Sequence, residues 1–315
     1  MGYQDILSAQ ERLNPVLFKT SLIEVPSVTD FTLYLKPENL QRTGSFKIRG
    51  AYNKMCMLSD EEKTCGVITS SAGNHAQGVA YAAQKDGIHA VVCMPKSTPQ
   101  IKINATLGYG AEVVLVDGVY DDAYQKALQL QKENGYTFVH PYNDEDVIAG
   151  QGTIGIEIMQ EHPEIDTVIV PVGGGGLAAG VACAVKSIRP DVKVYGVQPY
   201  GAPSMYASFA VGYVKPLSSV HTFADGIAVK KVGDVALEYV SKYVDDIILV
   251  DDSEILQGIK NLFSYEKLVV EGAGAASVAA VMGKHLSLEG KTVAAIVSGG
   301  NIDLSFFVKL MEGKQ

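Results

Sequence analysis

The stretch DTVIVPVGGGGLAAG, residues 166–180, carries the signal on which the fold assignment depends. A run of β-branched and apolar residues predicts a buried strand, and four consecutive glycines then lead into a helix of small residues. Bare N–H groups at a helix N-terminus bind phosphate, helped by the helix dipole, whereas side chains on the turn would block that approach. The stretch therefore predicts a strand–turn–helix unit that binds a phosphate.

The same glycines admit a second interpretation. Gly173, Gly175 and Ala178 match the GxGxxA pattern of dinucleotide sites. Such sites place an acidic residue at the end of the next strand to bind a ribose, and the next strand, DVKVYGVQP (191–199), has Gln198 there. A lone phosphate is the better inference, and a nicotinamide-dependent oxidoreductase stays open as an alternative of another class.

Short β-branched runs alternate with helical patterns on both sides of this unit. Strands are expected within residues 31–36, 65–73, 89–95, 111–118, 166–172, 191–199 and 291–301, and helices within 46–58, 74–87, 99–110, 120–135 and 177–190. This alternation predicts an α/β fold with mostly parallel sheets flanked by helices.

Composition excludes several classes of protein. The 315 residues carry a net charge of −9, which argues against a nucleic-acid-binding protein. The four cysteines are scattered and form no CxxC pair, so they read as reduced thiols rather than a disulfide framework or a zinc site. No signal peptide and no apolar stretch of about 18 residues is found. We therefore expect a cytoplasmic protein without a membrane partner.

Three further stretches carry polar groups in unusual settings. In GSFKIRGA (44–51), Lys47 lies between Phe46 and Ile48, and an apolar setting lowers the pKa of a lysine and makes its amine a nucleophile and a base. SSAGNHAQG (70–78) and VSGGN (297–301) each follow a predicted strand, where ligands bind in open parallel sheets. Taken singly, each stretch is also explained by a surface lysine, a helix N-cap or a polar turn.

Together these stretches closely resemble the fold-type II enzymes that use pyridoxal 5′-phosphate, specifically the threonine/serine dehydratase and serine racemase group. The matching pieces run in the family's order from about residue 31 to 304: LKPENLQRTGSFKIRGA, SSAGNHAQG, IAGQGTIGIEI, PVGGGGLAAG, VEGAGAAS and SGGNIDL. The resemblance implies a two-domain α/β fold similar to tryptophan synthase β. A large cofactor-binding domain would consist of residues 1–54 and 141–315, and a small domain, 55–140, would carry the asparagine loop.

The resemblance also implies roles for individual residues. Lys47 would carry the cofactor as a Schiff base and act as the catalytic residue, with Phe46 packed near the pyridine ring. Asn74 would hydrogen-bond the phenolic oxygen of that ring, and Ser298 its pyridine nitrogen. The phosphate would be held by backbone amides of Gly173, Gly174, Gly175, Gly176 and Leu177. The substrate carboxylate would be bound by Ser71, Gly73, Asn74 and His75.

The implied reaction is the β-elimination of water from L-threonine, and from L-serine, to give 2-oxobutyrate or pyruvate and ammonia. Ser298 suits elimination and suits transamination poorly, because a neutral hydroxyl does not hold a proton on the pyridine nitrogen. Racemases of the family carry a second serine where this chain has Ala72, so the acid–base group for the opposite face of Cα is missing. A serine racemase and a 3-hydroxyaspartate dehydratase remain alternatives within the family.

Other departures from the family concern metal, length and assembly. Eukaryotic racemases bind a divalent cation through an acidic pair, and the matching positions here are the uncharged Gln198 and Ser204, so we expect no metal site. The chain ends soon after SGGNIDL, so it resembles the short catabolic dehydratases and we expect no regulatory domain. The segment from KTSL (19–22) to LYLK (33–36) is shorter than usual in the family. The family also suggests a homodimer or homotetramer.

Overall fold

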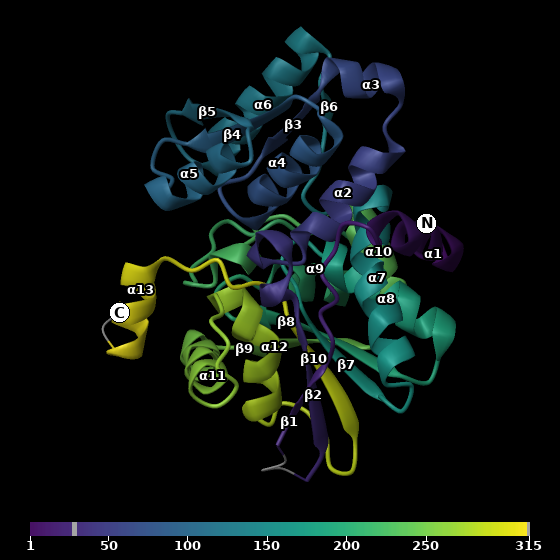
Figure 1. Cartoon of the computed structure of the whole chain (residues 1–315). Coiled ribbons are helices and arrows are strands. Elements are labelled where there is room, and N and C mark those ends of the chain that lie inside the picture. Colours follow the sequence, from purple (N-terminus) through teal and green to yellow (C-terminus); the bar gives the residue numbers. More distant parts are fainter. Residues whose placement is uncertain (27–29, 314–315) are drawn as a thin grey trace.

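The structure is a computed structural model, and it describes residues 1–26 and 30–313. The larger of its two sheets has six strands in the order β1–β2–β10–β7–β8–β9 (Figure 1). The strands are Ile23–Val25 (β1), Thr32–Pro37 (β2), Thr167–Pro171 (β7), Lys193–Pro199 (β8), Asp246–Val250 (β9) and Thr292–Val297 (β10). β1 pairs antiparallel with β2, and the other neighbours are parallel. Every residue of β7 is buried, as expected where helices cover both faces of a parallel sheet.

The smaller sheet has four parallel strands in the order β5–β4–β3–β6 (Figure 1). Its strands are Val67–Ser70 (β3), Ala90–Pro95 (β4), Glu112–Val116 (β5) and Thr137–Phe138 (β6). One face packs against α4 (Asn74–Asp86) and the other against α6 (Tyr120–Asn134), because alternate residues of β3 and β4 join separate apolar clusters. α5 (Gln100–Gly108) lies beside α4 and β5.

Helices likewise cover both faces of the larger sheet. On one face lie α7 (Glu145–Glu161), α8 (Gly176–Ile188) and α10 (Asp234–Tyr243), with α1 (Tyr3–Leu13) packed on α7 and α8. On the other lie α11 (Asp252–Ser264), α12 (Gly272–Met282) and α13 (Leu304–Met311). The remaining helices are α2 (Lys47–Met57), α3 (Asp60–Cys65) and α9 (Ser204–Val211), with short 3₁₀ turns η1 (Glu38–Leu40), η2 (Arg42–Gly44) and η3 (Asp225–Ile227).

The observed elements confirm the predicted α/β class with mostly parallel sheets, and each strand and helix predicted from the sequence is present. The domain limits stay a prediction, and the limit after residue 54 falls inside α2, which packs against both α4 and α7. The segment from 19 to 36 contains β1 and all of β2 except Pro37, and its residues 27–29 lie outside the described part. Within residues 1–26 and 30–313, no helix has the length and apolarity needed to cross a bilayer.

Candidate active site

The loops that follow β3, β7 and β10 meet around one cavity of about 920 Å³. Side chains and backbone from both sheets line it, as expected where the carboxyl ends of parallel strands face a common opening. Every residue predicted for the site lines this cavity: Phe46, Lys47, Ser71, Gly73, Asn74, His75, Gly173, Gly174, Gly175, Gly176, Leu177 and Ser298. The structure thus brings these residues together, while the role of each one stays a prediction.

Lys47 is the first residue of α2, and its amine donates a hydrogen bond to the carbonyl oxygen of Pro141 at 2.8 Å. Its Nζ atom is 5.2 Å from the centroid of the Phe46 ring. Burial lowers the pKa of Lys47 to about 8, and the electrostatic interaction with the Glu271 carboxyl group opposes the shift only in part. About one tenth of such an amine is neutral at pH 7. Lys47 is therefore placed and tuned to act as a nucleophile or a base.

The glycine turn, residues 173–176, presents unpaired N–H groups to the cavity. Gly175 is the N-cap of α8 and has a φ of 103°, in the left-handed region that favours glycine. Among the described residues, no backbone acceptor is found for the N–H groups of Gly173, Gly174 and Gly175. The first turn of α8 adds further N–H groups without helical partners. This set of donors fits a phosphate, as the resemblance implies for the cofactor.

The structure shows a reason for the glycines that was not predicted. A Cβ on Gly174 would lie 2.3 to 2.4 Å from ring carbons of Tyr142, and one on Gly176 would lie 2.9 Å from the Tyr142 backbone. A Cβ on Gly175 would lie 2.4 Å from Cε of Met205. Side chains are thus excluded by the close packing of the turn against the protein itself, whether or not an anion is bound.

The loop after β3 offers a second group of backbone donors. Asn74 and His75 are the first two residues of α4, so their N–H groups have no carbonyl partner within the helix. The hydroxyl of Ser71 accepts a hydrogen bond from the N–H of Gly73 at 3.2 Å. A Cβ on Gly73 would meet no atom within 4 Å, so the loop is open at that point. A substrate carboxylate is an anion that suits such donors.

Two histidines that line the cavity are neutral near pH 7. Nε2 of His75 lies 2.9 Å from the carbonyl oxygen of Val139, which requires the proton on Nε2. Burial lowers the pKa of His75 to about 3, and the charge of Lys47 adds to the shift. Nδ1 of His140 accepts a hydrogen bond from the N–H of Asn143 at 2.9 Å, and burial lowers its pKa to about 4. Neither ring is charged at neutral pH.

A buried carboxyl group and a buried hydroxyl complete the polar lining. Glu271 precedes α12 and is 5% exposed, and its Oε1 accepts a hydrogen bond from Nδ2 of Asn74 at 2.5 Å. Burial raises the pKa of Glu271 to about 8, and the charge of Asp225 adds to that rise. The hydroxyl of Ser298 donates to the carbonyl oxygen of Ala273 at 3.2 Å, so it must turn to donate to a pyridine nitrogen.

The lining residues for which no role was predicted from the sequence include Pro141, Tyr142, Glu271 and Asn301. Glu271 and Asn301 lie in VEGAGAAS and SGGNIDL, stretches that support the resemblance, but no role was inferred for either. Pro141 contributes a backbone carbonyl, which has no signature in sequence. Tyr142 contributes a ring that packs on a turn more than thirty positions away, between Gly173 and Gly176.

The absence of a metal site stays a prediction, and Gln198, which matches a cation-binding position of the racemases, has another role. The amide of Gln198 accepts hydrogen bonds from the N–H groups of Met205 and Tyr206 and donates to the carbonyl of Val172. It thereby caps α9 rather than facing a ligand. In the described part of the chain, no three His, Cys, Asp or Glu residues form a cluster able to hold a metal ion.

Comparison with known proteins gives the same family throughout. The chain is 51% identical over 311 residues to the L-threonine ammonia-lyase of Thermotoga maritima, a match that covers 98% of this chain and 77% of that protein. It is 45% identical over 313 residues to the catabolic L-threonine dehydratase TdcB of Escherichia coli K12, covering 97% and 94%. The structure of maize serine racemase superimposes with a TM-score of 0.94 at 36% identity, covering 99% and 97%. Residues 13–299 match the family described as pyridoxal-phosphate dependent enzymes, so the chain belongs to that family.

Proposed function

We propose that this protein is a threonine ammonia-lyase that converts L-threonine to 2-oxobutyrate and ammonia, and L-serine to pyruvate and ammonia. Two relatives named for threonine deamination share 45 to 51% of their residues with it over most of its length. The observation that carries the proposal is the buried amine of Lys47, with a pKa of about 8, in the same cavity as a glycine turn whose N–H groups have no backbone partner among the described residues. The N–H groups can bind the phosphate of a phosphorylated aldehyde, and the amine can bind its aldehyde carbon and transfer one proton.

The residues present fit pyridoxal phosphate. Residues 173–177 supply amide donors for its phosphate, and Phe46 supplies an apolar face for its ring. Asn74 and Ser298 supply hydrogen-bonding groups for the phenolic oxygen and the pyridine nitrogen. When bound, the cofactor supplies an electron sink for the electron pair left at Cα of the substrate.

The protein's own part in the reaction follows from the groups around Lys47. N–H groups of the 71–75 loop bind and orient the substrate carboxylate. The neutral amine of Lys47 removes the Cα proton, and its low pKa makes the neutral form available near pH 7. The β-hydroxyl leaves as water, and hydrolysis of the resulting enamine yields the keto acid and ammonia. Both histidines stay neutral, so they add no competing charge beside Lys47.

Racemisation is disfavoured by the residue at position 72. A racemase exchanges protons on both faces of Cα and needs an acid–base group on each. Ala72 lines the cavity with a methyl group, which cannot exchange a proton. The fold itself does not discriminate, because the maize racemase has a TM-score of 0.94. The nicotinamide-dependent alternative is abandoned, because the chain belongs to the pyridoxal-phosphate dependent enzymes.

The test is a keto-acid assay of the purified protein on L-threonine, L-serine, D-serine and 3-hydroxyaspartate, with chiral analysis of recovered serine. Lys47→Ala should abolish turnover. Lys54→Ala is the matched control, because Lys54 lies on the same helix but pairs with Asp144 and Asp146. Ala72→Ser should raise the yield of D-serine from L-serine. Dehydration by a cofactor-loaded Lys47→Ala protein at the wild-type rate would overturn the proposal, and so would a wild type inactive on the whole panel.

We also propose that the enzyme works as a homodimer or homotetramer in the cytoplasm, which the resemblance to dehydratases supports. Light scattering on the purified protein measures its assembly state, and fractionation of the source cells measures its location.

A further inference from the structure

The side-chain amide of Asn301 is held by a backbone carbonyl group and by the side-chain amide of Asn74. Its Nδ2 donates one hydrogen bond to the carbonyl oxygen of Thr43 at 2.7 Å and another to Oδ1 of Asn74 at 2.7 Å. A backbone carbonyl only accepts hydrogen bonds, so the nitrogen of the Asn301 amide, and not its oxygen, must face Thr43. Both hydrogens of that nitrogen are then in use.

The orientation of Asn301 determines that of Asn74. Because Nδ2 of Asn301 is a donor, the atom of Asn74 that faces it must be the acceptor Oδ1. Nδ2 of Asn74 then faces the carboxyl group of Glu271, with an Nδ2–Oε1 distance of 2.5 Å. This uses one of its two hydrogens, and within the described residues no protein acceptor is found for the other. Asn74 therefore offers one N–H to a ligand in the cavity that it lines.

The turn that accepts from Asn301 is itself strained. Thr43 has a φ of 63°, which is rare for a β-branched residue, and Gly44 follows with a φ of 69°. A Cβ on Gly44 would lie 2.5 Å from Oδ1 of Asn301, so the glycine makes room for that side chain. The N–H of Gly300 donates to the carbonyl of Gly44 at 2.9 Å and ties the two turns together. Hydrogen bonds thus connect the strained turn, residues 43–44, to the loop that carries Asn301.

We propose that Asn301 is a positioning residue, which holds the Asn74 amide with its free N–H toward the ligand oxygen, while Glu271 fixes the other Nδ2 hydrogen. The proposal rests on the proposed function, in which that oxygen is the phenolic oxygen of the cofactor. A rotated amide would present Oδ1 instead, and an acceptor facing an oxygen anion is repulsive. Asn301 would act on the reaction only through Asn74.

The test compares Asn301→Ala and Asn301→Asp with Asn74→Ala in the cofactor-loaded enzyme. Asn301→Asp keeps the shape but replaces the donor with an acceptor, so it should drive the Asn74 amide to turn. We expect both Asn301 variants to change the ratio of the absorption bands of the bound cofactor in the same direction as Asn74→Ala. Their kcat should fall roughly 10- to 100-fold, the loss for one hydrogen bond to a charged oxygen. In Asn74→Ala/Asn301→Ala, kcat should stay within about twofold of Asn74→Ala alone.

Asn39→Ala is the matched control. Asn39 packs against Gly300 of the same loop and donates to the carbonyl of Val269 at 3.2 Å, but it does not line the cavity. It should lower the unfolding temperature and leave the absorption bands and kcat unchanged. If Asn39→Ala shifts the bands as Asn301→Ala does, Asn301 is merely structural and the inference fails.

Two other outcomes also overturn the inference: wild-type bands and kcat in both Asn301 variants, or effects of Asn301→Ala and Asn74→Ala that multiply fully in the double variant. If Asn301→Asp does not fold, Asn301→Ala decides alone. A wild-type protein that binds no cofactor or forms no keto acid refutes the proposed function instead. The two failures are therefore told apart by the wild type.

Discussion

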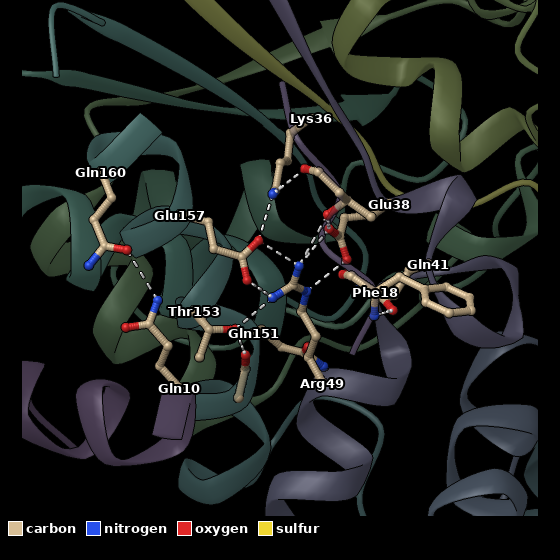
Figure 2. A network of polar contacts seen from close by, with 12 residues as sticks. Gln10, Phe18, Lys36, Glu38, Gln41, Arg49, Gln151, Thr153, Glu157 and Gln160 are labelled. Atoms are coloured by element: carbon tan, nitrogen blue, oxygen red, sulfur yellow. Dashed lines mark hydrogen bonds and ion pairs between the residues drawn. The ribbon is translucent and has the colours of Figure 1, made fainter. Parts of the chain in front are cut away.

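Removal of the Arg49 side chain should destabilise the protein strongly, because Arg49 is the centre of a buried ionic network (Figure 2). The guanidinium is fully buried and makes paired hydrogen bonds to the carboxyl group of Glu38, at 2.7 Å each. It makes a second pair to Glu157, at 2.6 and 2.8 Å. Lys36 also donates to Glu157 at 2.6 Å. Burial alone would disfavour the charged guanidinium, but the two carboxylates outweigh it and raise the pKa of Arg49.

The magnitude follows from what Arg49→Met leaves behind. Glu157 is 25% exposed and keeps Lys36, which together with Arg49 holds the pKa of Glu157 down to about 2 against the effect of burial. The side chain of Glu38 has no exposed surface, and the hydroxyl of Thr20, which donates at 2.6 Å, is then its one side-chain partner among residues 1–26 and 30–313. Leaving one partner of a buried pair uncompensated costs about 3–5 kcal/mol. For a chain of this size that corresponds to a fall in Tm of about 5–10 °C.

The decisive variant is Arg49→Met combined with Glu38→Met. Replacing both members of a buried ion pair with apolar side chains of similar volume is often neutral, so the double variant should recover most of the lost stability. Thermal unfolding followed by circular dichroism at a fixed scan rate measures all three variants. A single variant within about 1 °C of wild type would refute the reasoning, and so would a double variant less stable than the single one.

The remaining predictions concern the cavity. Below a pKa of about 8 the neutral fraction of the Lys47 amine falls about tenfold per pH unit. The test measures how much pyridoxal reacts with Lys47 in the cofactor-free protein, by peptide mass spectrometry after hydride reduction. The labelled fraction should rise with pH and level off above about pH 8. A rise that continues beyond pH 10 would contradict the low pKa. Gly174→Ala should lower the free energy of unfolding by about 1–3 kcal/mol in urea titrations through its clash with Tyr142, and Tyr142→Ala should relieve part of that loss. Lys102 of α5 forms an ion pair with Asp225 of η3 at 2.6 Å, and both residues line the cavity. Because the pair is partly exposed, Lys102→Met should change Tm by less than about 2 °C, and because salt screens the pair, the variant should show a smaller salt dependence of KM. A salt dependence equal to that of the wild type would show that the ion pair does not affect substrate binding.

The parts of the molecule that could be predicted are those written in local sequence. The strand TVIVP and the glycines after it predicted β7, its turn and the start of α8, because a buried parallel strand is a continuous apolar run. The helix α12, GAGAASVAAVM, has ten of its residues buried and so lacks the alternation of apolar and polar faces that marks a helix in sequence.

The contacts that could not be predicted depend on tertiary proximity. Asn301 meets Thr43 and Asn74 across more than two hundred positions of the chain, and only the fold shows that their hydrogen bonds form one system. The phosphate site at the glycine turn stays a prediction. The ring of Tyr142 is a further reason for the glycines there, and its packing on the turn has no sequence signal.

The close packing of the glycine turn against Tyr142 and Met205 has a consequence for the phosphate binding that we propose there. If the four glycines were in a flexible loop, ligand binding would cost conformational entropy, because the backbone of each glycine would have to be ordered on binding. Here Tyr142 and Met205 pack closely on the turn, so under the proposed function the phosphate would bind a preorganised backbone and its binding would cost little conformational entropy. Calorimetry should accordingly record inorganic phosphate binding to the empty protein with a heat-capacity change too small for a coupled folding of the loop.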